Sequence, residues 1–410
     1  MFDIDSWQEI FGTIKKNKLR TFLTGFSVAW GIFMLIILLG SGKGFENGVK
    51  KQFAGDAVNS IWVYSGSTSM AYKGFKPGRR IRFTNNDYDE TKLKVKQVEE
   101  ISSRYGIGGN HSITYKEKYG AFNIVTVHPA TKHIEKIQMK EGRFINEIDI
   151  NKYRKITSIS KIVKDALFDK KEEAIGKYIN INNIPFKVVG IFEDKNERDN
   201  RRIYIPISTA QKVFNGNNRI RNLAFTTKNV SPKQSKKLEE KVREQFASRH
   251  KFDKEDKSAI YINNNIDNFR QANNLFTGIS IFIWIIGIGT IIAGIVGVSN
   301  IMIIVVKERT KEIGIRKAIG ATPNSIIFQI LSEAILITGI AGYVGLVLGV
   351  GLLELISTNL KGTDFFLNPQ VDFRIAISAT LLLIFSGALA GFFPAKRASK
   401  IKPIIALRDE

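Results

Sequence analysis

Four long stretches without a charged residue constrain this chain more than any other feature of its sequence. Each contains about 20 or more mostly apolar residues, the number that an α-helix needs to cross the hydrocarbon core of a bilayer. The average composition hides this, because 44% hydrophobic and 24% charged residues resemble those of a soluble protein. The uncharged stretches are residues 21–42, 271–306, 334–353 and 375–395. The sequence therefore predicts an integral membrane α-helical protein with four transmembrane helices.

The first stretch has an alternative interpretation as a signal peptide cleaved near residues 40–42. Its apolar run is about 20 residues, whereas the apolar region of a signal peptide has about 7–15. Three acidic residues, Asp3, Asp5 and Glu9, also precede it. We therefore expect an uncleaved membrane anchor.

Basic residues next to the stretches predict the orientation, because Lys and Arg are retained on the cytoplasmic side. Basic clusters precede the first stretch at residues 15–20, follow the second at 307–317 and follow the fourth at 396–402. We expect a bacterial inner-membrane protein with both termini in the cytoplasm and the large segment 43–275 in the periplasm. The predicted order is a cytoplasmic amphipathic helix at 1–20, transmembrane helix 1 at 21–42, an outer domain with a stalk at 43–275, helix 2 at 276–306, a cytoplasmic helix at 307–323, helix 3 at 324–357, a short periplasmic loop at 358–373, helix 4 at 374–394 and a cytoplasmic tail at 395–410.

The segment 43–275 alternates strand-like with helical runs, which predicts a large α+β extracytoplasmic domain inserted between helices 1 and 2. Residues 178–192 resemble a hairpin that turns at Asn182 and Asn183. Ser231 followed by Pro232 is typical of a helix start. From Asn265, a continuous helix of about 40 residues would be roughly 60 Å long, twice the bilayer core of about 30 Å, so we expect a stalk.

Several classes of function are excluded by composition and motifs. The chain has no Cys and only four scattered His, which excludes disulfides and makes a transition-metal site unfavourable. Residues 40–44 (GSGKG) lack the spacing of a phosphate-binding loop. The chain has a net charge of +23, and most of it lies in the segment 43–275. This basic segment indicates either a solvated lysine-rich surface or attraction to anionic lipid or an acidic partner. We expect no catalytic residue, no bound cofactor or metal, and no nucleic-acid partner.

Small residues at i, i+4 spacing let transmembrane helices approach closely. They predict either a compact bundle or a dimer interface. An acid inside an apolar run, Glu333, is a candidate for a buried structural partner, a wet interface or a proton relay. The packing candidates are Gly289, Ala293 and Gly297, then Ala341, Gly345 and Gly349, with Gly387 and Gly391, and Gly25 and Ala29.

The segment after the second stretch predicts a short charged helix that ends at Gly320 and Pro323. Its sequence at 308–321, ERTKEIGIRKAIGA, resembles the MacB/FtsX-like family of ABC transporter permeases. Residues 17–24 (NKLRTFLT) and 394–408 (PAKRASKIKPIIALR) are similar to the same family. In the outer segment, residues 141–144 (EGRF) and 186–191 (FKVVGI) resemble the MacB-like periplasmic core.

This resemblance implies a permease subunit that does not itself hydrolyse ATP. ATP and Mg would be bound by a partner ABC ATPase, and the stalk would transmit its movement to the periplasmic domain. The implied further partners are a second permease chain (a homodimer or a paralogue), a periplasmic adaptor (membrane fusion protein), an outer-membrane channel and the lipid bilayer. The implied ATPase-coupling residues are Glu308, Arg309, Glu312, Ile313, Gly314, Arg316, Lys317, Ala318, Gly320 and Ala321.

Efflux of periplasmic substrates is the first expectation for the function. Alternatives within the class are lipoprotein release, as in the Lol system, and regulation of cell-wall hydrolases, as for FtsX. A membrane sensor or scaffold without transport is the alternative from another class. A sensor would need no ATPase, so co-purification of an ATP-binding subunit separates the two classes.

Overall fold

The computed structural model describes residues 18–52, 55–109, 111–194, 199–228, 230–359, 367–369 and 373–403. The chain divides into a helical unit, residues 1–49 with 274–410, and a mixed unit, residues 50–273. Most of the predicted amphipathic helix 1–20, most of the loop 358–373 and the end of the tail lie outside the described residues.

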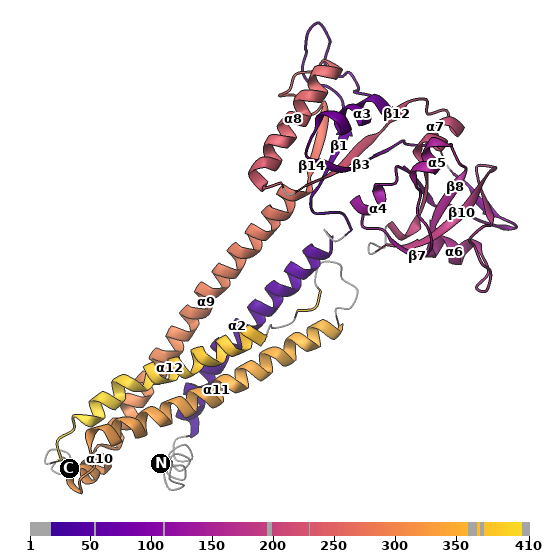
Figure 1. The fold of residues 1–410 in the computed structure, drawn as a ribbon. Helices are drawn as coiled ribbons and strands as arrows, with labels where there is room; N and C mark the ends of the chain where they lie inside the picture. Colours follow the sequence, from indigo (N-terminus) through magenta and orange to yellow (C-terminus); the bar gives the residue numbers. More distant parts are fainter. Residues whose placement is uncertain are drawn as a thin grey trace. The chain divides into compact units, whose positions relative to one another are not determined.

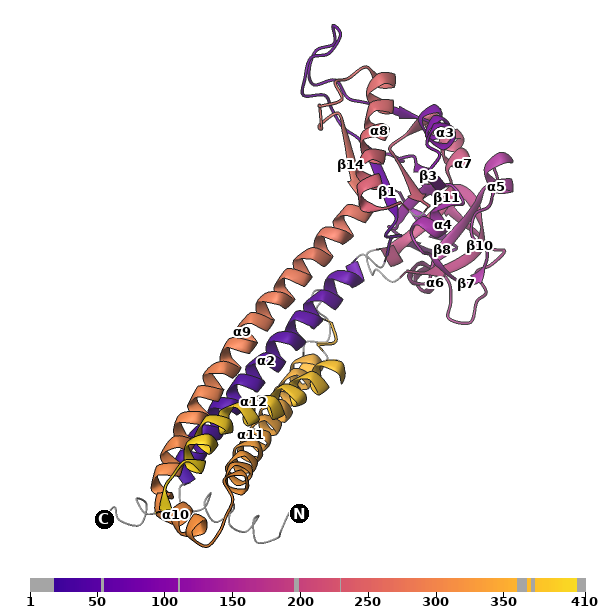
Figure 2. The same cartoon turned by 60° about the vertical axis from the view of Figure 1, so that its left-hand side comes forward.

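Long helices make up the helical unit (Figures 1 and 2). They are α2 (Lys18–Gln52), α9 (Asn265–Glu308), α10 (Thr310–Ala318), α11 (Pro323–Asn359) and α12 (Phe373–Ser399). Among the described residues, three stretches are long and apolar enough to cross a membrane, and they lie in α2, α9 and α11. The predicted fourth span forms helix α12. That α12 crosses the membrane stays a prediction.

Helix α9 confirms the predicted continuous helix that starts at Asn265. It runs for 44 residues to Glu308, which at 1.5 Å per residue is about 66 Å. The helix begins directly after strand β14 (Ile260–Asn264) of the mixed unit.

Helices α2 and α11 touch through small residues. A Cβ atom added to Gly345 would overlap the carbonyl oxygen of Ala29, whereas one added to Gly25 would make an ordinary contact with the Cβ of Ala341, at 3.4 Å. A Cβ at Gly349 would lie 2.9 Å from Ile36. Close approach at this crossing therefore requires glycine on α11.

Helices α11 and α12 lie side by side along their length (Figures 1 and 2). A Cβ at Gly391 would lie 2.7 Å from the Cβ of Ala334, and one at Gly387 would overlap Thr338. These two glycines let the helices pack at short distance.

Helix α9 uses different glycines from the expected ones for contact with α2. Gly287 faces Leu35, and Gly294 faces Val28. Gly289 and Gly297 have no described atom within 4 Å of an added Cβ, and Ala293 is exposed. The stripe Gly289–Ala293–Gly297 therefore lies on a face of α9 that no described residue packs against closely.

The mixed unit contains a four-stranded antiparallel sheet covered on one face by helix α8 (Pro232–His250). The strand order is β14, β1 (Ser60–Ser65), β13 (Asn222–Thr227) and β3 (Val98–Arg104). Its core contains Val63, Phe225 and, from α8, Phe246, all almost fully buried. The predicted start of α8 is confirmed: Ser231 caps it, and Gln234 completes a capping box.

The mixed unit also contains an eight-stranded sheet. Its order is β5 (Lys118–Gly120), β4 (Ile113–Tyr115), β9 (Tyr178–Ile181), β10 (Ile184–Glu193), β8 (Ile156–Ser160), β11 (Arg202–Pro206) and β6 (Asn123–Val127), with β7 (Gln138–Gly142) paired to β10. The pairs β8–β10 and β6–β11 are parallel. The predicted hairpin is confirmed, since β9 and β10 join at Asn182 and Asn183, both with positive φ.

Short strands and helices complete the mixed unit. They are β2 (Phe83–Thr84) paired with β12 (Arg219–Ile220), and the helices α3 (Asn85–Lys94), α4 (Thr131–Ile134), α5 (Glu147–Asn151), α6 (Lys161–Leu167), η1 (Asp199–Arg201) and α7 (Ile207–Val213). The mixture of sheets and helices confirms the predicted α+β class.

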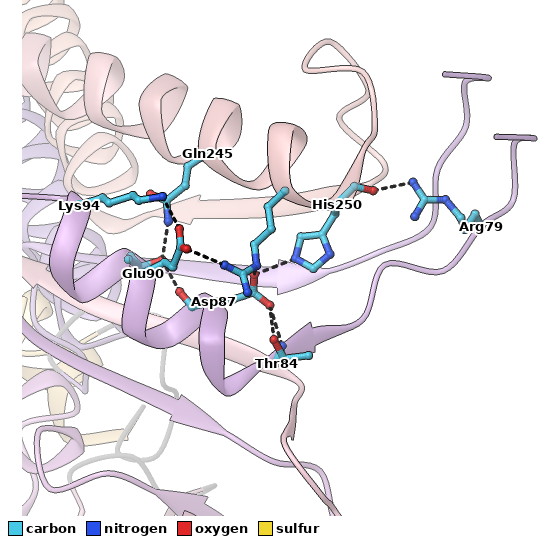
Figure 3. Close-up of polar contacts among 9 residues, drawn as sticks. Arg79, Thr84, Asp87, Glu90, Lys94, Gln245 and His250 are labelled. Carbon is cyan, nitrogen blue, oxygen red and sulfur yellow. Dashed lines mark hydrogen bonds and ion pairs between the residues drawn. The ribbon is translucent and has the colours of Figure 1, made fainter. Parts of the chain in front are cut away.

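A buried carboxylate joins α3 to the end of α8 (Figure 3). Asp87 is fully buried and accepts hydrogen bonds from the Thr84 backbone at 2.7 Å and from the His250 ring at 2.9 Å. The Nε of Arg249 lies 2.7 Å from the same carboxylate. These partners replace the water that the charge loses on burial.

Candidate functional site: the connection between α9 and α11

Helix α10 has well-defined ends, as the sequence predicts. Helix α9 ends before Arg309, whose φ of −94° and ψ of 11° are not helical. At the other end Gly320 has a φ of +108°, which favours glycine. The amide of Ala321 donates to Arg316 O at 2.9 Å, and that of Gly320 donates to Lys317 O at 3.2 Å. This pair of bonds is a Schellman motif, and Pro323 then opens α11.

One face of α10 packs against the other helices of the helical unit. Ile313 and Gly314 are buried. Ile313 belongs to an apolar cluster with Val306 of α9, Ile330 of α11 and Ala395 of α12. The short helix is therefore anchored in the bundle rather than loosely attached.

Charged side chains tie α10 to α11. The guanidinium of Arg309 lies 3.2 Å from Glu333 and 3.1 Å from Glu312. Arg316 lies 2.9 Å from Glu312 and donates to the Gln329 side chain at 3.0 Å. The intramembrane acid found in the sequence thus has a structural partner, Arg309.

Because the Arg309–Glu333 ion pair is buried, its loss should lower the stability of the helical unit. Glu333 is only 3% exposed, and a cavity of about 20 Å³ beside it, about the size of one water molecule, is lined partly by Arg309 and Glu312. Removing one partner of a buried ion pair typically costs about 3–5 kcal/mol, because the other charge is left without compensation.

Lys317 ties α10 to the end of α12. Its ammonium group donates to the carbonyl oxygens of Ser399 at 2.8 Å and Ile401 at 2.7 Å. Carbonyl groups at the end of a helix have no partner within the helix, and cations there also interact favourably with the helix dipole. Through Lys317, Arg309 and Arg316, α10 is connected to both α11 and α12.

The opposite face of α10 is exposed and partly apolar. Ile315 is 43% exposed and Ile319 is 82% exposed, and Lys311 and Ala318 lie on the same face. Residues at i and i+4 are neighbours on a helix surface, so the two isoleucines form one patch. They are not among the coupling residues that the resemblance implies, although their spacing amid charged residues was a detectable signal.

The remaining implied coupling residues lie at the ends of the helices. Glu308 is the exposed last residue of α9, Gly320 is exposed and Ala321 is half-buried. In the part of the chain that the structure describes, no three His, Asp or Glu residues are grouped as a metal site requires.

Two family models match this chain. The MacB-like periplasmic core domain matches residues 21–245, and the FtsX-like permease C-terminal domain matches residues 284–403. The chain belongs to the MacB/FtsX family of ABC transporter permeases. Its α2 segment and mixed unit thus correspond to the MacB-like part of the family, and α10 and its surroundings to the FtsX-like part.

Individual proteins of similar sequence support the same family assignment. The "Macrolide export ATP-binding/permease protein MacB" of Bdellovibrio bacteriovorus is 28% identical over 99% of this chain and 62% of that protein. The chain therefore spans about three-fifths of the length of its MacB relatives. The "Uncharacterized ABC transporter permease YvrN" of Bacillus subtilis is 29% identical over 98% of both chains.

Solved structures of outer domains also match in part. The periplasmic region of MacB from Actinobacillus actinomycetemcomitans matches with a TM-score of 0.43 and 20% identity, covering 54% of this chain and 94% of that one. The extracellular domain of the transporter YknZ from Gram-positive bacteria matches with a TM-score of 0.41 and 19% identity, covering 50% of this chain and all of that one.

Proposed function

We propose that this permease receives the movement of a separate cytoplasmic ABC ATPase at α10 and transmits it mechanically to residues 50–273 on the outer side of the membrane. The result would be efflux of substrates from the periplasm. In this proposal both termini and α10 lie in the cytoplasm of a bacterial cell, and the mixed unit lies outside its inner membrane.

The exposed apolar face of α10 is the observation that carries the proposal. A protein interface is commonly organised around a few well-packed apolar residues. Ile315 and Ile319 offer such residues on a helix that is otherwise strongly charged. On the other side, Arg309 at the start of α10 binds Glu333 of α11, and Lys317 binds the end of α12. A force that the ATPase applies to the exposed face would therefore displace several helices rather than one loop.

A separate ATPase is supported by similarity to YvrN. That protein is named a permease, and it aligns with this chain over 98% of its own length. ATP and Mg would accordingly be bound by the partner, and no residue of this chain is assigned a catalytic role. The MacB relatives are named as ATP-binding/permease proteins.

Efflux is favoured within the class by the names of the relatives. They include macrolide export proteins and the "Pyoverdine export ATP-binding/permease protein PvdT" of Pseudomonas syringae, 26% identical over 99% of this chain. Export across the periplasm would also engage an adaptor and an outer-membrane channel.

A second permease chain is supported by the uncovered stripe of α9. Gly289, Ala293 and Gly297 line one face of the helix, with Ile292 and Val296 exposed beside them. Small residues in a row allow a second helix to approach closely. We propose that this face contacts a second copy or a paralogous permease.

Replacing Ile319 by Glu tests the proposal. We expect Ile319→Glu to reduce the ATPase activity of the complex with the partner ABC ATPase at least about tenfold, because a charge would replace an apolar contact. The matched control is Leu93→Glu on α3, since Leu93 is 80% exposed and Ile319 82%. Equal activity of the two variants, with the ATPase still bound to both, would remove α10 from the coupling role.

A further inference from the structure

Strand β14 and helix α9 follow each other without a loop between them. Asn264 is the last residue of β14, and Asn265 is the first residue of α9. By contrast, residues 53–59 separate the end of α2 at Gln52 from the start of β1 at Ser60. The two long helices that continue into the mixed unit are therefore attached to it in different ways.

Both asparagines at the junction of β14 and α9 are buried and hydrogen-bonded. Asn264 is 5% exposed, and its side-chain amide donates to the hydroxyl of Ser235 in α8 at 2.7 Å. Asn265 is 7% exposed, and its side-chain amide donates to the hydroxyl of Ser60 in β1 at 2.8 Å. Ser60 and Ser235 are themselves fully buried. The junction thus contains two polar pairs that are hidden from solvent.

The two hydrogen bonds join the junction to two different elements of the mixed unit. One reaches α8, which packs on the four-stranded sheet, and the other reaches β1, the strand that pairs with β14. A rotation or a tilt of the first turn of α9 would break at least one of these bonds. A buried polar group without its partner is costly, because it has also lost its hydrogen bonds to water. The first turn of α9 should therefore move with the sheet as one body.

The connection between α2 and β1 is attached differently. Its last residues belong to the mixed unit, since the amide of Ala57 donates to Ile134 O at 2.7 Å and the Asn59 side chain donates to Thr227 O at 2.8 Å. Before them, Gly55 has no described atom within 4 Å of an added Cβ. Because glycine adopts many backbone conformations, this connection is a less rigid link than the junction of β14 and α9.

We propose that Asn264 and Asn265 fix the start of α9 to the four-stranded sheet, so that α9, and not α2, positions the sheet when the helical unit moves. The two asparagines, with Ser60 and Ser235, are positioning residues. The inference rests on the proposed function, because it names the helix through which movement reaches residues 50–273.

Distances between spin labels test the junction in the full chain without any partner. The labels are placed at Lys237→Cys in α8 and Arg270→Cys in α9, which are exposed and lie in the mixed unit of a chain without native Cys. We expect a narrow distance distribution in the original chain. It should become at least about twofold broader in Asn265→Leu with Ser60→Ala, which keeps an apolar filling but removes the hydrogen bond. Ser60→Thr, which keeps the hydroxyl, and Asn268→Leu, at an exposed asparagine of the same helix, should leave it narrow.

Insertions of Gly-Ser-Gly compare the two attachments in the complex with the partner ABC ATPase. One variant has the insertion between residues 264 and 265, and the matched variant has it between residues 55 and 56. Labels at Lys43→Cys in α2 and Lys237→Cys in α8 report the distance before and after addition of ATP and orthovanadate. We expect a nucleotide-dependent change of this distance in the original chain and in the matched variant, and its loss in the variant with the insertion at the junction.

Three results would overturn the inference. They are a narrow distribution in Asn265→Leu with Ser60→Ala, a nucleotide-dependent change that persists with the insertion between residues 264 and 265, and loss of the change with the insertion between residues 55 and 56. The last result would mean that α2 also positions the sheet.

A failure of the proposed function would give a different result. The nucleotide-dependent change would then be absent from the original chain, while the label pair within the mixed unit would still decide whether the junction is fixed. The fluorescence of the buried Trp62 shows whether each variant is folded. If the insertion at the junction unfolds the mixed unit, Asn265→Leu with Ser60→Ala takes its place in the complex, with the same expected loss.

Discussion

Lys317 connects the helix that faces the proposed ATPase with the helix that ends the bundle. Its two hydrogen bonds to Ser399 and Ile401 involve a charged donor, and such bonds are stronger than neutral ones. Arg309 and Arg316 make the corresponding connections to α11. Three cations therefore hold α10 in place, while its apolar face remains exposed.

Replacing Lys317 by Met should separate docking from transmission. We expect the ATPase to co-purify with Lys317→Met as with the original chain, because Lys317 is not part of the exposed face. Its ATPase activity should fall several-fold, since about 2–3 kcal/mol of charge-assisted bonding to α12 is lost. Lys317→Arg should restore most of the activity, and Lys400→Met, at an exposed lysine next to the same helix end, should have no effect. Normal activity in Lys317→Met would contradict this role.

His128 is a second residue with an effect that can be measured. Burial first, and then the positive charge of nearby Lys92, lower the pKa of its ring to about 4. The Ser103 amide donates a hydrogen bond to Nδ1 at 3.1 Å, which uses the lone pair of the neutral ring. The ring also stacks on Tyr88 at 4.2 Å. The unfolded chain, with an ordinary pKa of about 6.5, takes up the proton first as the pH falls.

The mixed unit should therefore lose stability on acidification. The contribution of His128 is complete above about pH 6.5 and disappears as the pH falls to about 4, by up to about 3 kcal/mol. Urea unfolding of the full chain, followed by the fluorescence of the buried Trp62, measures this change. His128→Gln, which keeps an acceptor for Ser103, should be less sensitive to pH over this range, and an identical pH dependence in both proteins would refute the assignment.

Among the helices, contact depends on which face each glycine occupies. Gly345 lies where α11 crosses α2, whereas Gly339 of the same helix has no described atom within 4 Å of an added Cβ. Both positions are glycines within the same helix, so the same substitution at each changes the helix propensity equally. A difference in stability between the two variants therefore reports the packing against α2.

Gly345→Val should destabilise the bundle by about 1–3 kcal/mol, because the new side chain overlaps the backbone of Ala29. Gly339→Val should leave the stability nearly unchanged. Thermal unfolding of the two variants in detergent measures the difference. Similar melting temperatures would mean that α2 and α11 do not approach as closely as described.

Helix ends and turns were the elements that the sequence predicted best. Gly320, Asn182 with Asn183, and Ser231 with Pro232 all mark the expected boundaries. Each depends on the conformational preferences of one or two residues, which the surrounding fold does not change. The pairing of β1 with β13 and β14 was not predicted, because their residues are about 160 to 200 positions apart and their alternation of side chains is similar to that of other strands.

For the whole molecule, orientation in the membrane is the central expectation. The chain has no Cys, so single cysteines can be introduced without removing native ones. Leu93 in the mixed unit and Ile319, the C-cap residue of α10, are both highly exposed and suit labelling.

A membrane-impermeant maleimide should label Leu93→Cys once the outer membrane, where present, is permeabilised. It should label Ile319→Cys only after the inner membrane is opened, because basic residues beside the spans retain α10 in the cytoplasm. The reverse pattern would place the mixed unit in the cytoplasm and exclude the proposed mechanism.

The amino-acid sequence by itself determined where the chain has apolar spans, where several helices and turns end, and to which family it belongs. These properties are local, since they depend on runs of residues and on single backbone conformations. Only the tertiary structure decided that Glu333 pairs with Arg309, that Gly345 rather than Gly289 touches another helix, and that Ile315 and Ile319 remain exposed. Those outcomes depend on which helix faces come together, and many arrangements of the same apolar helices satisfy the bilayer equally well.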